Sequence, residues 1–398
     1  MNSAGAPGAS RWAVLACYAL LAACTQLLWL TFAPIDTEAA RALHTDVGLV
    51  GDLAAVFPFV YIVLALPAGR WLDRRFAPAL GAGALLTGGG AVLRAAFPGS
   101  FGWQLAGQLV IACGQPLVLN SINAVAARYF PERERAAAIS AGSVALFVGV
   151  LAAVLSGRPL YGAGGLPLVL GVQAAVAVVA AGLASLALRT PPGYAGDAAG
   201  SVSLRWLARD RLMWLLAGLV FIGMGTYNAV ATWLEPILQR YGEGASAGGL
   251  VAGMTLAGIV GAAVLPSPVA ARDRRRSMLL AALGLSVVVF VALAARHEIA
   301  WVAAWLAAEG FLLMACLPVV LSWSEVHTGP ERQSAAVGFL LMAGSLGGVV
   351  LVLVVQVFIG SPSLALLALA GASLAGLLAA MRLPARVGTG RSAVGSKR

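Results

Sequence analysis

Twelve apolar runs of about 20 residues follow one another along this chain, and they constrain its fold more than any other feature. They lie near residues 12–34, 47–69, 77–97, 101–126, 136–157, 166–188, 212–239, 245–270, 277–296, 299–323, 334–359 and 361–382. An α-helix needs about 20 apolar residues to cross about 30 Å of bilayer hydrocarbon. The runs therefore predict an all-α polytopic membrane protein with twelve transmembrane helices.

Composition leaves no room for a separate water-soluble domain. The chain is 60% hydrophobic and 11% charged, whereas an ordinary soluble domain has about 25% charged residues. The longest polar stretch, residues 189–211, is too short to fold alone. The first apolar run lacks a strong basic region before it and a small-residue cleavage site after it, which favours a retained span over a signal peptide. We expect all function to lie within the helix bundle.

The positions of the basic residues predict an orientation. With the N-terminus inside, 21 of the 26 lysines and arginines lie on the cytoplasmic side and five lie outside, the asymmetry that short cytoplasmic loops carry. We expect a multi-pass protein of the cell (inner) membrane with both termini in the cytoplasm. Topology and attraction to anionic lipid headgroups account for the net charge of +10, so no nucleic-acid partner is expected.

An internal repeat divides the chain into two halves. Asp73-Arg74-Arg75 returns as Asp273-Arg274-Arg275, and the 20 residues from Pro131 match those from Pro330 at seven positions. Inside the membrane, Pro116 aligns with Pro318. The repeat predicts two six-helix bundles, residues 1–188 and 212–383, with a cytoplasmic linker (189–211) and a cytoplasmic tail (384–398).

Two parallel six-helix halves joined by an Arg-rich loop resemble the major facilitator superfamily of transporters. The GxxxD element from Gly69 to Asp73, followed by two arginines, is similar to that superfamily's signature after helix 2. The resemblance implies a conformational clamp on the cytoplasmic face. Its candidate members are Gly69, Asp73, Arg74, Arg75, Asp273 and Arg274. Phe76-Ala77-Pro78 departs from the usual pattern, which implies a looser first clamp.

Polar side chains at membrane depth are costly and usually face a cavity or a partner. The candidates for substrate binding are Trp29, Gln115, Tyr227, Asn228, Glu309 and Ser345. Most of them fall in spans 1, 4, 7 and 10, which line the central cavity in this superfamily. Glu309 is the carboxylate nearest mid-membrane, so it is also the candidate proton-coupling group; the alternative is a glutamate that only ties helices together. Pro116 and Pro318 predict bends in both halves.

A continuous run, GQPLVLNSINAVAARYFPERERAAAIS, resembles the feline leukaemia virus subgroup C receptor (FLVCR) family of facilitators and its prokaryotic relatives. Animal members are associated with choline and ethanolamine transport and with haem export. The resemblance implies a cage for a quaternary amine with Trp29, Tyr227 and Gln115 as members. A second glutamine of that cage falls on Ser345, which is a departure, and Glu309 has no place in it.

The sequence leaves several alternatives open. Trp29 could belong to an interfacial aromatic belt, and Tyr227 could pack against a neighbour. We expect a secondary active or facilitative transporter of a small polar or cationic organic solute; the alternatives are a proton-coupled exporter of drugs, haem or metabolites, and a non-transporting receptor or scaffold.

No buried nucleophile–base pair or metal-ligand spacing occurs, so we expect no enzyme activity, no cofactor and no metal. The expected partners are a small-molecule substrate and the lipid bilayer, and the expected state is a monomer.

Overall fold

The computed structural model describes residues 8–194, 204–329 and 331–385, and every regular element in these ranges is a helix. Eleven helical segments are long and apolar enough to cross a membrane. They are Ser10–Ala42, Val47–Arg74, Phe76–Ala96, Phe101–Tyr129, Glu132–Ala187, Arg211–Gln239, Ala247–Ala271, Arg275–Ala295, Ile299–Thr328, Gln333–Val357 and Pro362–Ala380.

The segment α7 (Glu132–Ala187) contains two of the predicted spans. Its 56 residues would measure about 84 Å as one straight helix, nearly three times the hydrocarbon thickness. The backbone leaves helical geometry at Gly164 and at Gly165, which has a φ of 64° that glycine adopts without strain. The chain therefore turns back here without a separate loop, and the described part of the chain has twelve membrane-crossing helices, as the sequence predicts.

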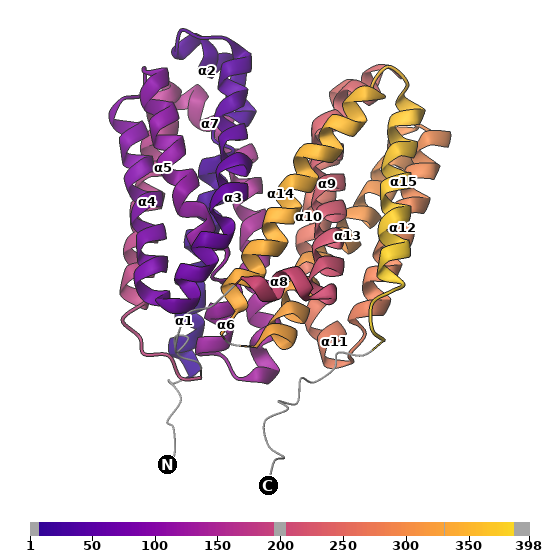
Figure 1. Cartoon of the computed structure of the whole chain (residues 1–398). Coiled ribbons are helices and arrows are strands. Elements are labelled where there is room, and N and C mark those ends of the chain that lie inside the picture. Colours follow the sequence, from indigo (N-terminus) through magenta and orange to yellow (C-terminus); the bar gives the residue numbers. More distant parts are fainter. Residues whose placement is uncertain (1–7, 195–203, 330, 386–398) are drawn as a thin grey trace.

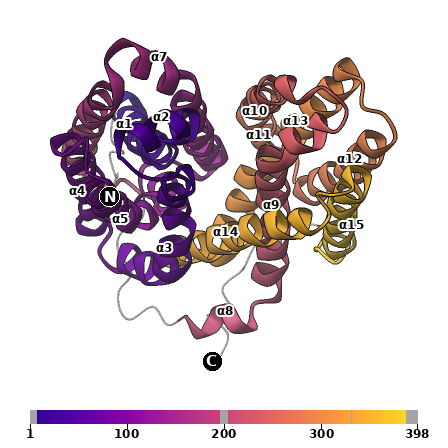
Figure 2. The same ribbon diagram turned by 90° about the horizontal axis from the view of Figure 1, so that it is seen from above.

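The helices form two bundles that lie side by side (Figures 1 and 2). The first contains α1 (Gly8–Trp29), α3 (Val47–Arg74), α4 (Phe76–Ala96), α5 (Phe101–Leu119), α6 (Ile122–Tyr129) and α7. The second contains α9 (Arg211–Gln239), α10 (Ala247–Val264), α11 (Pro266–Ala271), α12 (Arg275–Ala295), α13 (Ile299–Thr328), α14 (Gln333–Val357) and α15 (Pro362–Ala380).

We call the end of the molecule that holds Gly8 and Ala385 the base, and the end that holds α2 (Asp36–Ala42) the rim. The short helix α8 (Arg205–Arg209) lies toward the base in Figure 1 and outside the two bundles in Figure 2. Residues 195–203 of the predicted linker, Pro330 of the repeat and residues 386–398 of the predicted tail lie outside the described residues.

Glycines allow the helices within each bundle to pack at close range. A Cβ on Gly149 of α7 would lie 2.1 Å from the Ala23 carbonyl oxygen of α1, and a Cβ on Gly347 of α14 would lie 2.0 Å from the Phe221 carbonyl oxygen of α9. Any larger residue would force these backbones apart, so the glycines fix the pairs α1–α7 and α9–α14.

Two of the predicted spans are interrupted in the first bundle. Span 1 ends as an α-helix at Trp29 and continues as the 3-10 turn η1 (Ala33–Ile35) because Pro34 has no N–H for the α-helical ladder. Span 4 consists of α5 and α6, with a break at Asn120 and Ser121 a few residues after Pro116. In the second bundle α13 remains helical through Pro318. The aligned prolines therefore accompany a broken helix in the first half alone.

Candidate functional site

The carboxylate of Asp73, near the end of α3, contacts the other bundle at the base. Its Oδ1 accepts a hydrogen bond from the Ser334 backbone N–H at 2.8 Å, and its Oδ2 accepts one from the Ala335 N–H at 3.0 Å. Both N–H groups belong to the first turn of α14, which has no intrahelical acceptor for them. Asp73 is buried, so a helix of one bundle caps a helix of the other.

Gly69 makes this contact possible. A Cβ at Gly69 would lie 2.7 Å from the Ala335 Cα and from the Ser334 carbonyl oxygen. One turn further from the base, a Cβ at Gly338 would lie 2.6 Å from the Ala65 carbonyl oxygen and 2.7 Å from the Asn120 Nδ2. Two glycines on facing helices therefore allow α3 and α14 to cross in direct backbone contact.

Further polar contacts close the base between the bundles. The Asn123 Nδ2 donates to the Leu321 carbonyl oxygen at 2.9 Å. Arg135 of α7 pairs with Glu325 of α13 at 2.9 Å, and the Ser140 hydroxyl donates to the Ala262 carbonyl oxygen. These contacts and those of Asp73 join the two bundles near the base, whereas the bundles diverge toward the rim (Figure 1).

The repeated motif has a different geometry in the second half. Asp273 follows α11 with a φ of 49°, and its Oδ1 lies 3.3 Å from the Nη1 of Arg275 in the same bundle. Arg74, Arg75 and Arg274 are exposed. Among the described residues, the cross-bundle cap therefore comes from Asp73 and Gly69 rather than from the arginines predicted with them.

Trp29 lies at the rim end of α1 and is half-buried. Its indole Nε1 donates to the Ala54 carbonyl oxygen of α3 at 2.9 Å. Pro58 stands four residues after Ala54 and has no N–H, so this carbonyl lacks its helical donor. The indole therefore satisfies an acceptor that the α3 proline leaves free, and this hydrogen bond fixes the ring.

Tyr227 of α9 is also half-buried, and its hydroxyl lies 3.0 Å from the Thr255 hydroxyl of α10. No ring contact in the described part of the chain joins Tyr227 to Trp29, which belongs to the opposite bundle. Sequence reasoning missed Trp233, whose indole Nε1 donates to the Val352 carbonyl oxygen at 2.9 Å. A partial signal was present: a Trp-Leu pair precedes a Pro-Ile pair in both halves, with Trp29 five residues before Pro34 and Trp233 three before Pro236.

Gln115, Asn228 and Ser345 make no side-chain hydrogen bond with any residue that the structure describes. Gln115 has an exposed fraction of only 5%. The Asn228 side chain packs on Gly348, where a Cβ would lie 2.4 Å from its Nδ2. Ser345 is half-buried on α14. The polar atoms of these three side chains are therefore unengaged within the described structure, whereas those of Trp29 and Tyr227 are hydrogen-bonded.

Glu309 lies apart from the other candidates. It is fully buried, with an exposed fraction of 0%. Its Oε1 accepts a hydrogen bond from the Ser286 hydroxyl of α12 at 2.5 Å, and its Oε2 has no partner among the described residues. Its side chain therefore faces a helix of its own bundle rather than the opposite bundle. In this conformation Glu309 is not brought together with Trp29, Gln115 or Tyr227.

The sequence analysis also did not predict a polar network in the first bundle. Its centre is Arg94, near the end of α4, which is 1% exposed and hydrogen-bonds to Gln108 and Gln173. In the sequence-based count Arg94 is one of the five basic residues assigned to the outer side, because it lies near the outer end of the predicted span 77–97. Buried glutamines on α5 and on the second half of α7 were the signal for such a network.

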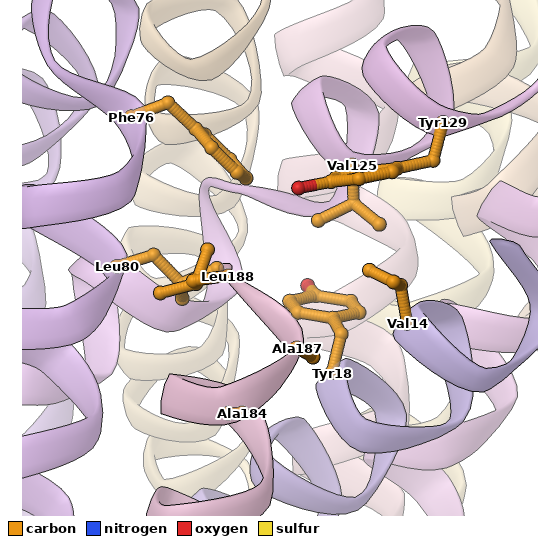
Figure 3. A pocket seen from close by; sticks show the side chains of 9 residues that line it. All are labelled: Val14, Tyr18, Phe76, Leu80, Val125, Tyr129, Ala184, Ala187 and Leu188. Carbon is orange, nitrogen blue, oxygen red and sulfur yellow. The ribbon is translucent and has the colours of Figure 1, made fainter. Parts of the chain in front are cut away.

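A small pocket near the base of the first bundle is separate from these residues (Figure 3). Its lining is apolar apart from the hydroxyls of Tyr18 and Tyr129, which donate to the carbonyl oxygens of Val118 and Thr190. None of the predicted substrate-binding residues lines it, so it is not the predicted site.

Comparison with protein families decides the class of the chain. Residues 14–272 match the family model described as Major Facilitator Superfamily. The chain belongs to the Major Facilitator Superfamily. It is therefore a multi-pass membrane transporter rather than an enzyme, and proteins of this superfamily bind small-molecule substrates within the membrane.

Curated relatives confirm the resemblance to the FLVCR family, because the relatives named Solute carrier family 49 member A3 belong to that family. The chain is 27% identical over 380 residues to Solute carrier family 49 member A3 of Danio rerio, a match that covers 87% of this chain and 78% of the relative. The same protein of Xenopus tropicalis is 25% identical over 376 residues, covering 87% and 77%. An uncharacterized protein of Archaeoglobus fulgidus is 30% identical over 149 residues, which cover 37% of this chain and 69% of the relative.

Solved structures share the fold. A variant of the E. coli fucose:proton symporter FucP has a TM-score of 0.74 at 19% identity, covering 93% of this chain and 97% of its own. FucP in the outward conformation has a TM-score of 0.73 at 18% identity and covers 93% and 99%. The human organic anion transporter MFSD10 has a TM-score of 0.76 at 14% identity and covers 94% and 100%.

Proposed function

We propose that this transporter moves a small polar or cationic organic solute across the cell (inner) membrane by alternating access. The proposal assigns the structure to the outward-facing state, with the base on the cytoplasmic side and both termini in the cytoplasm. The division into bundles 1–188 and 212–383, linker 189–211 and tail 384–398 is part of the proposal, as is function as a monomer.

The observation that carries the proposal is the distribution of contacts between the bundles. Asp73 caps α14, Asn123 bonds to α13, and Arg135 pairs with Glu325, all near the base. Toward the rim the bundles diverge (Figure 1). Rocking of one bundle against the other would break these contacts and open the base. The likeness to FucP in the outward conformation supports the same assignment.

Charge at the rim supports a cationic substrate. Seven acidic residues lie in the rim loops and adjoining helix ends: Asp36, Glu38, Asp46, Asp52, Glu235, Glu243 and Glu298. Four exposed arginines share this surface: Arg41, Arg158, Arg240 and Arg296. The entrance of an outward-facing transporter would then be net negative, which raises the local concentration of cations and lowers that of anions.

The proposed binding residues are Trp29, Gln115, Tyr227, Asn228 and Ser345. The ring faces of Trp29 and Tyr227 suit an organic cation, since a cation–π contact contributes about 0.5–2 kcal/mol. The unengaged amides of Gln115 and Asn228 suit the polar end of such a solute. Gly69 and Asp73 form the proposed conformational clamp, and Arg74, Arg75, Asp273 and Arg274 stay candidate members of it.

Proton coupling is the second candidate, and it rests on Glu309. A buried carboxylate with one unpartnered oxygen is costly as an anion and can take up a proton. The fold relative FucP is a fucose:proton symporter, which shows that this fold supports proton coupling. In this candidate Glu309 carries the proton through movements of α12 and α13 rather than by contact with the substrate.

A thermal-shift screen tests the proposed substrate class. Purified protein is heated with choline, ethanolamine, amino acids, haem and dicarboxylates, each at two pH values. A ligand that binds the folded state raises the unfolding temperature. We expect stabilisation by an organic amine and a smaller effect in Trp29→Ala and Tyr227→Ala. Stabilisation by dicarboxylates alone would exclude the cationic class.

A further inference from the structure

The guanidinium of Arg94 is the most deeply buried positive charge in the described part of the chain. It is 1% exposed, and no carboxylate lies within ion-pair distance of it among the described residues. A buried charge without an opposite charge is strongly destabilising unless other groups compensate it. Its neighbours must therefore supply that compensation, and they are oxygens of three different helices.

One set of these oxygens belongs to the rim end of α1. The Arg94 Nη1 donates to the Leu28 carbonyl oxygen at 3.3 Å and to the Thr31 hydroxyl at 3.2 Å. The carbonyls of the last helical turn lack intrahelical donors and form the negative end of the helix dipole. Arg94 therefore shares the C-terminal cap of α1 with the Thr31 hydroxyl, which donates to the same Leu28 carbonyl oxygen at 2.9 Å. The centroid of the Phe32 ring lies 5.8 Å from the guanidinium carbon.

A second set connects Arg94 to α3. The same Nη1 donates to the Gln108 Oε1 at 2.6 Å, and the Gln108 Nε2 donates to the Leu53 carbonyl oxygen at 3.2 Å. The next carbonyl along α3, that of Ala54, is the one that accepts from the Trp29 indole. Arg94 therefore contacts Leu28, next to Trp29, directly, and it is connected to Leu53, next to Ala54, through Gln108.

The Gln173 side chain completes the network from the second half of α7. Its Oε1 accepts from the Arg94 Nη2 at 3.3 Å and from the Thr31 hydroxyl at 2.6 Å. Four membrane helices therefore meet at one guanidinium beside the point where α1 ends. Lysine could not reproduce this arrangement, because an ammonium lacks the planar fork that reaches several acceptors at fixed angles.

We propose that Arg94 is a positioning residue that fixes the rim end of α1 and, through it, the Trp29 ring that faces the substrate. The substrate part of this inference rests on the proposed function. The conformational part does not, because it concerns the ligand-free protein. Without Arg94, the Leu28 carbonyl oxygen keeps only the Thr31 hydroxyl as a side-chain donor, so the rim end of α1 and the Trp29 ring are held less firmly.

The first test is hydrogen exchange of the ligand-free, full-length protein. The variants are Arg94→Gln, Arg94→Lys and Thr31→Val, which keeps side-chain shape and removes one partner of the guanidinium together with the hydrogen bonds of this hydroxyl to Leu28 and Gln173. Arg41→Gln is the matched control, since Arg41 is an exposed arginine of the same rim. We expect peptides covering residues 28–36 to exchange faster than in wild type in all three variants. In the control their exchange rate should stay at the wild-type value. Unchanged exchange in Arg94→Gln and Arg94→Lys would overturn the proposal, whatever Thr31→Val does, because Thr31 also donates to the Leu28 carbonyl oxygen directly.

The second test is a double-mutant cycle on uptake of labelled choline, used as the probe amine, into proteoliposomes. We expect Arg94→Lys to raise the half-saturating concentration about 2- to 30-fold, the range that a cation–π contact covers, with the maximal rate nearly unchanged. In a Trp29→Ala background the same substitution should add nothing, because residues that act through one contact are not additive. Additive effects would overturn the positioning role. If Trp29→Ala itself has no effect on any amine, the proposed function fails while the exchange test still decides the conformational part.

Discussion

Substitution of Asp73 by asparagine should open the base of this transporter. In the structure both carboxylate oxygens accept backbone N–H groups of α14, at 2.8 and 3.0 Å. Asparagine has a single acceptor oxygen, so one N–H would face an NH₂ group. A hydrogen bond to a charged group contributes about 1.5–3 kcal/mol and a neutral one about 0.5–1.5 kcal/mol. We therefore expect a loss of about 2–3 kcal/mol, which shifts the equilibrium toward the base-open state roughly 30- to 150-fold.

Distances between spin labels measure this shift directly. A cysteine-free background replaces Cys17, Cys24, Cys113 and Cys316. One label pair spans the rim at the exposed positions 52 and 235, and a second spans the base at the exposed positions 133 and 272. Asp73→Asn should shorten the rim distance and lengthen the base distance.

The matched control is Asp46→Asn, which removes an exposed carboxylate before α3. It should leave both distance distributions unchanged, since Asp46 makes no contact between the bundles in the described structure. Wild-type distributions in Asp73→Asn would refute the reasoning that this carboxylate holds the base closed.

Three further predictions concern single contacts. Gly69→Ala places a Cβ 2.7 Å from the Ala335 Cα, so the distance between the base labels should increase and transport should stop. Gly99→Ala is the control, since nothing lies within 4 Å of its added Cβ, and it should behave as wild type. A wild-type base distance in Gly69→Ala would contradict the packing. Arg135→Glu should open the base by breaking the ion pair with Glu325. The charge-swapped double variant, Arg135→Glu with Glu325→Arg, should restore at least part of the closure measured by the same labels. No restoration would mean that this ion pair is not a gate. Glu309→Gln should abolish proton-driven accumulation while sparing counterflow exchange, as measured in proteoliposomes with an imposed pH gradient, and unchanged accumulation would remove the coupling role.

The fold was largely predictable from the sequence because a bilayer admits few solutions. Apolar runs of the right length specify spanning helices, since backbone groups in lipid must be satisfied within the segment. The repeat of Asp73-Arg74-Arg75 and of the 20 residues from Pro131 then indicated two related bundles. Interruptions were harder to predict. Pro116 and Pro318 have the same local pattern, yet only α5 ends nearby, because tertiary contacts decide whether a proline kinks or breaks a helix.

The candidate site was only partly predictable. Chemistry and depth identified the polar residues of the spans, but not the direction in which each side chain points. Glu309 turns toward Ser286, and the Trp29 indole is engaged by a carbonyl that Pro58 frees on another helix. Arg94 lay close to a predicted loop, so its burial depended on Gln108 and Gln173, which are distant in sequence. Contacts between residues this far apart in the sequence could not be predicted from local patterns, because they form only when the helices pack into the bundle.

Counterflow exchange tests the central claim most directly. Proteoliposomes containing the purified protein are loaded with unlabelled choline or ethanolamine, and the entry of the labelled amine is followed over time. We predict transient accumulation of the label that a saturating unlabelled amine abolishes and that Asp73→Asn slows. Counterflow of an organic anion, with no exchange of either amine, would contradict the account of a cation transporter.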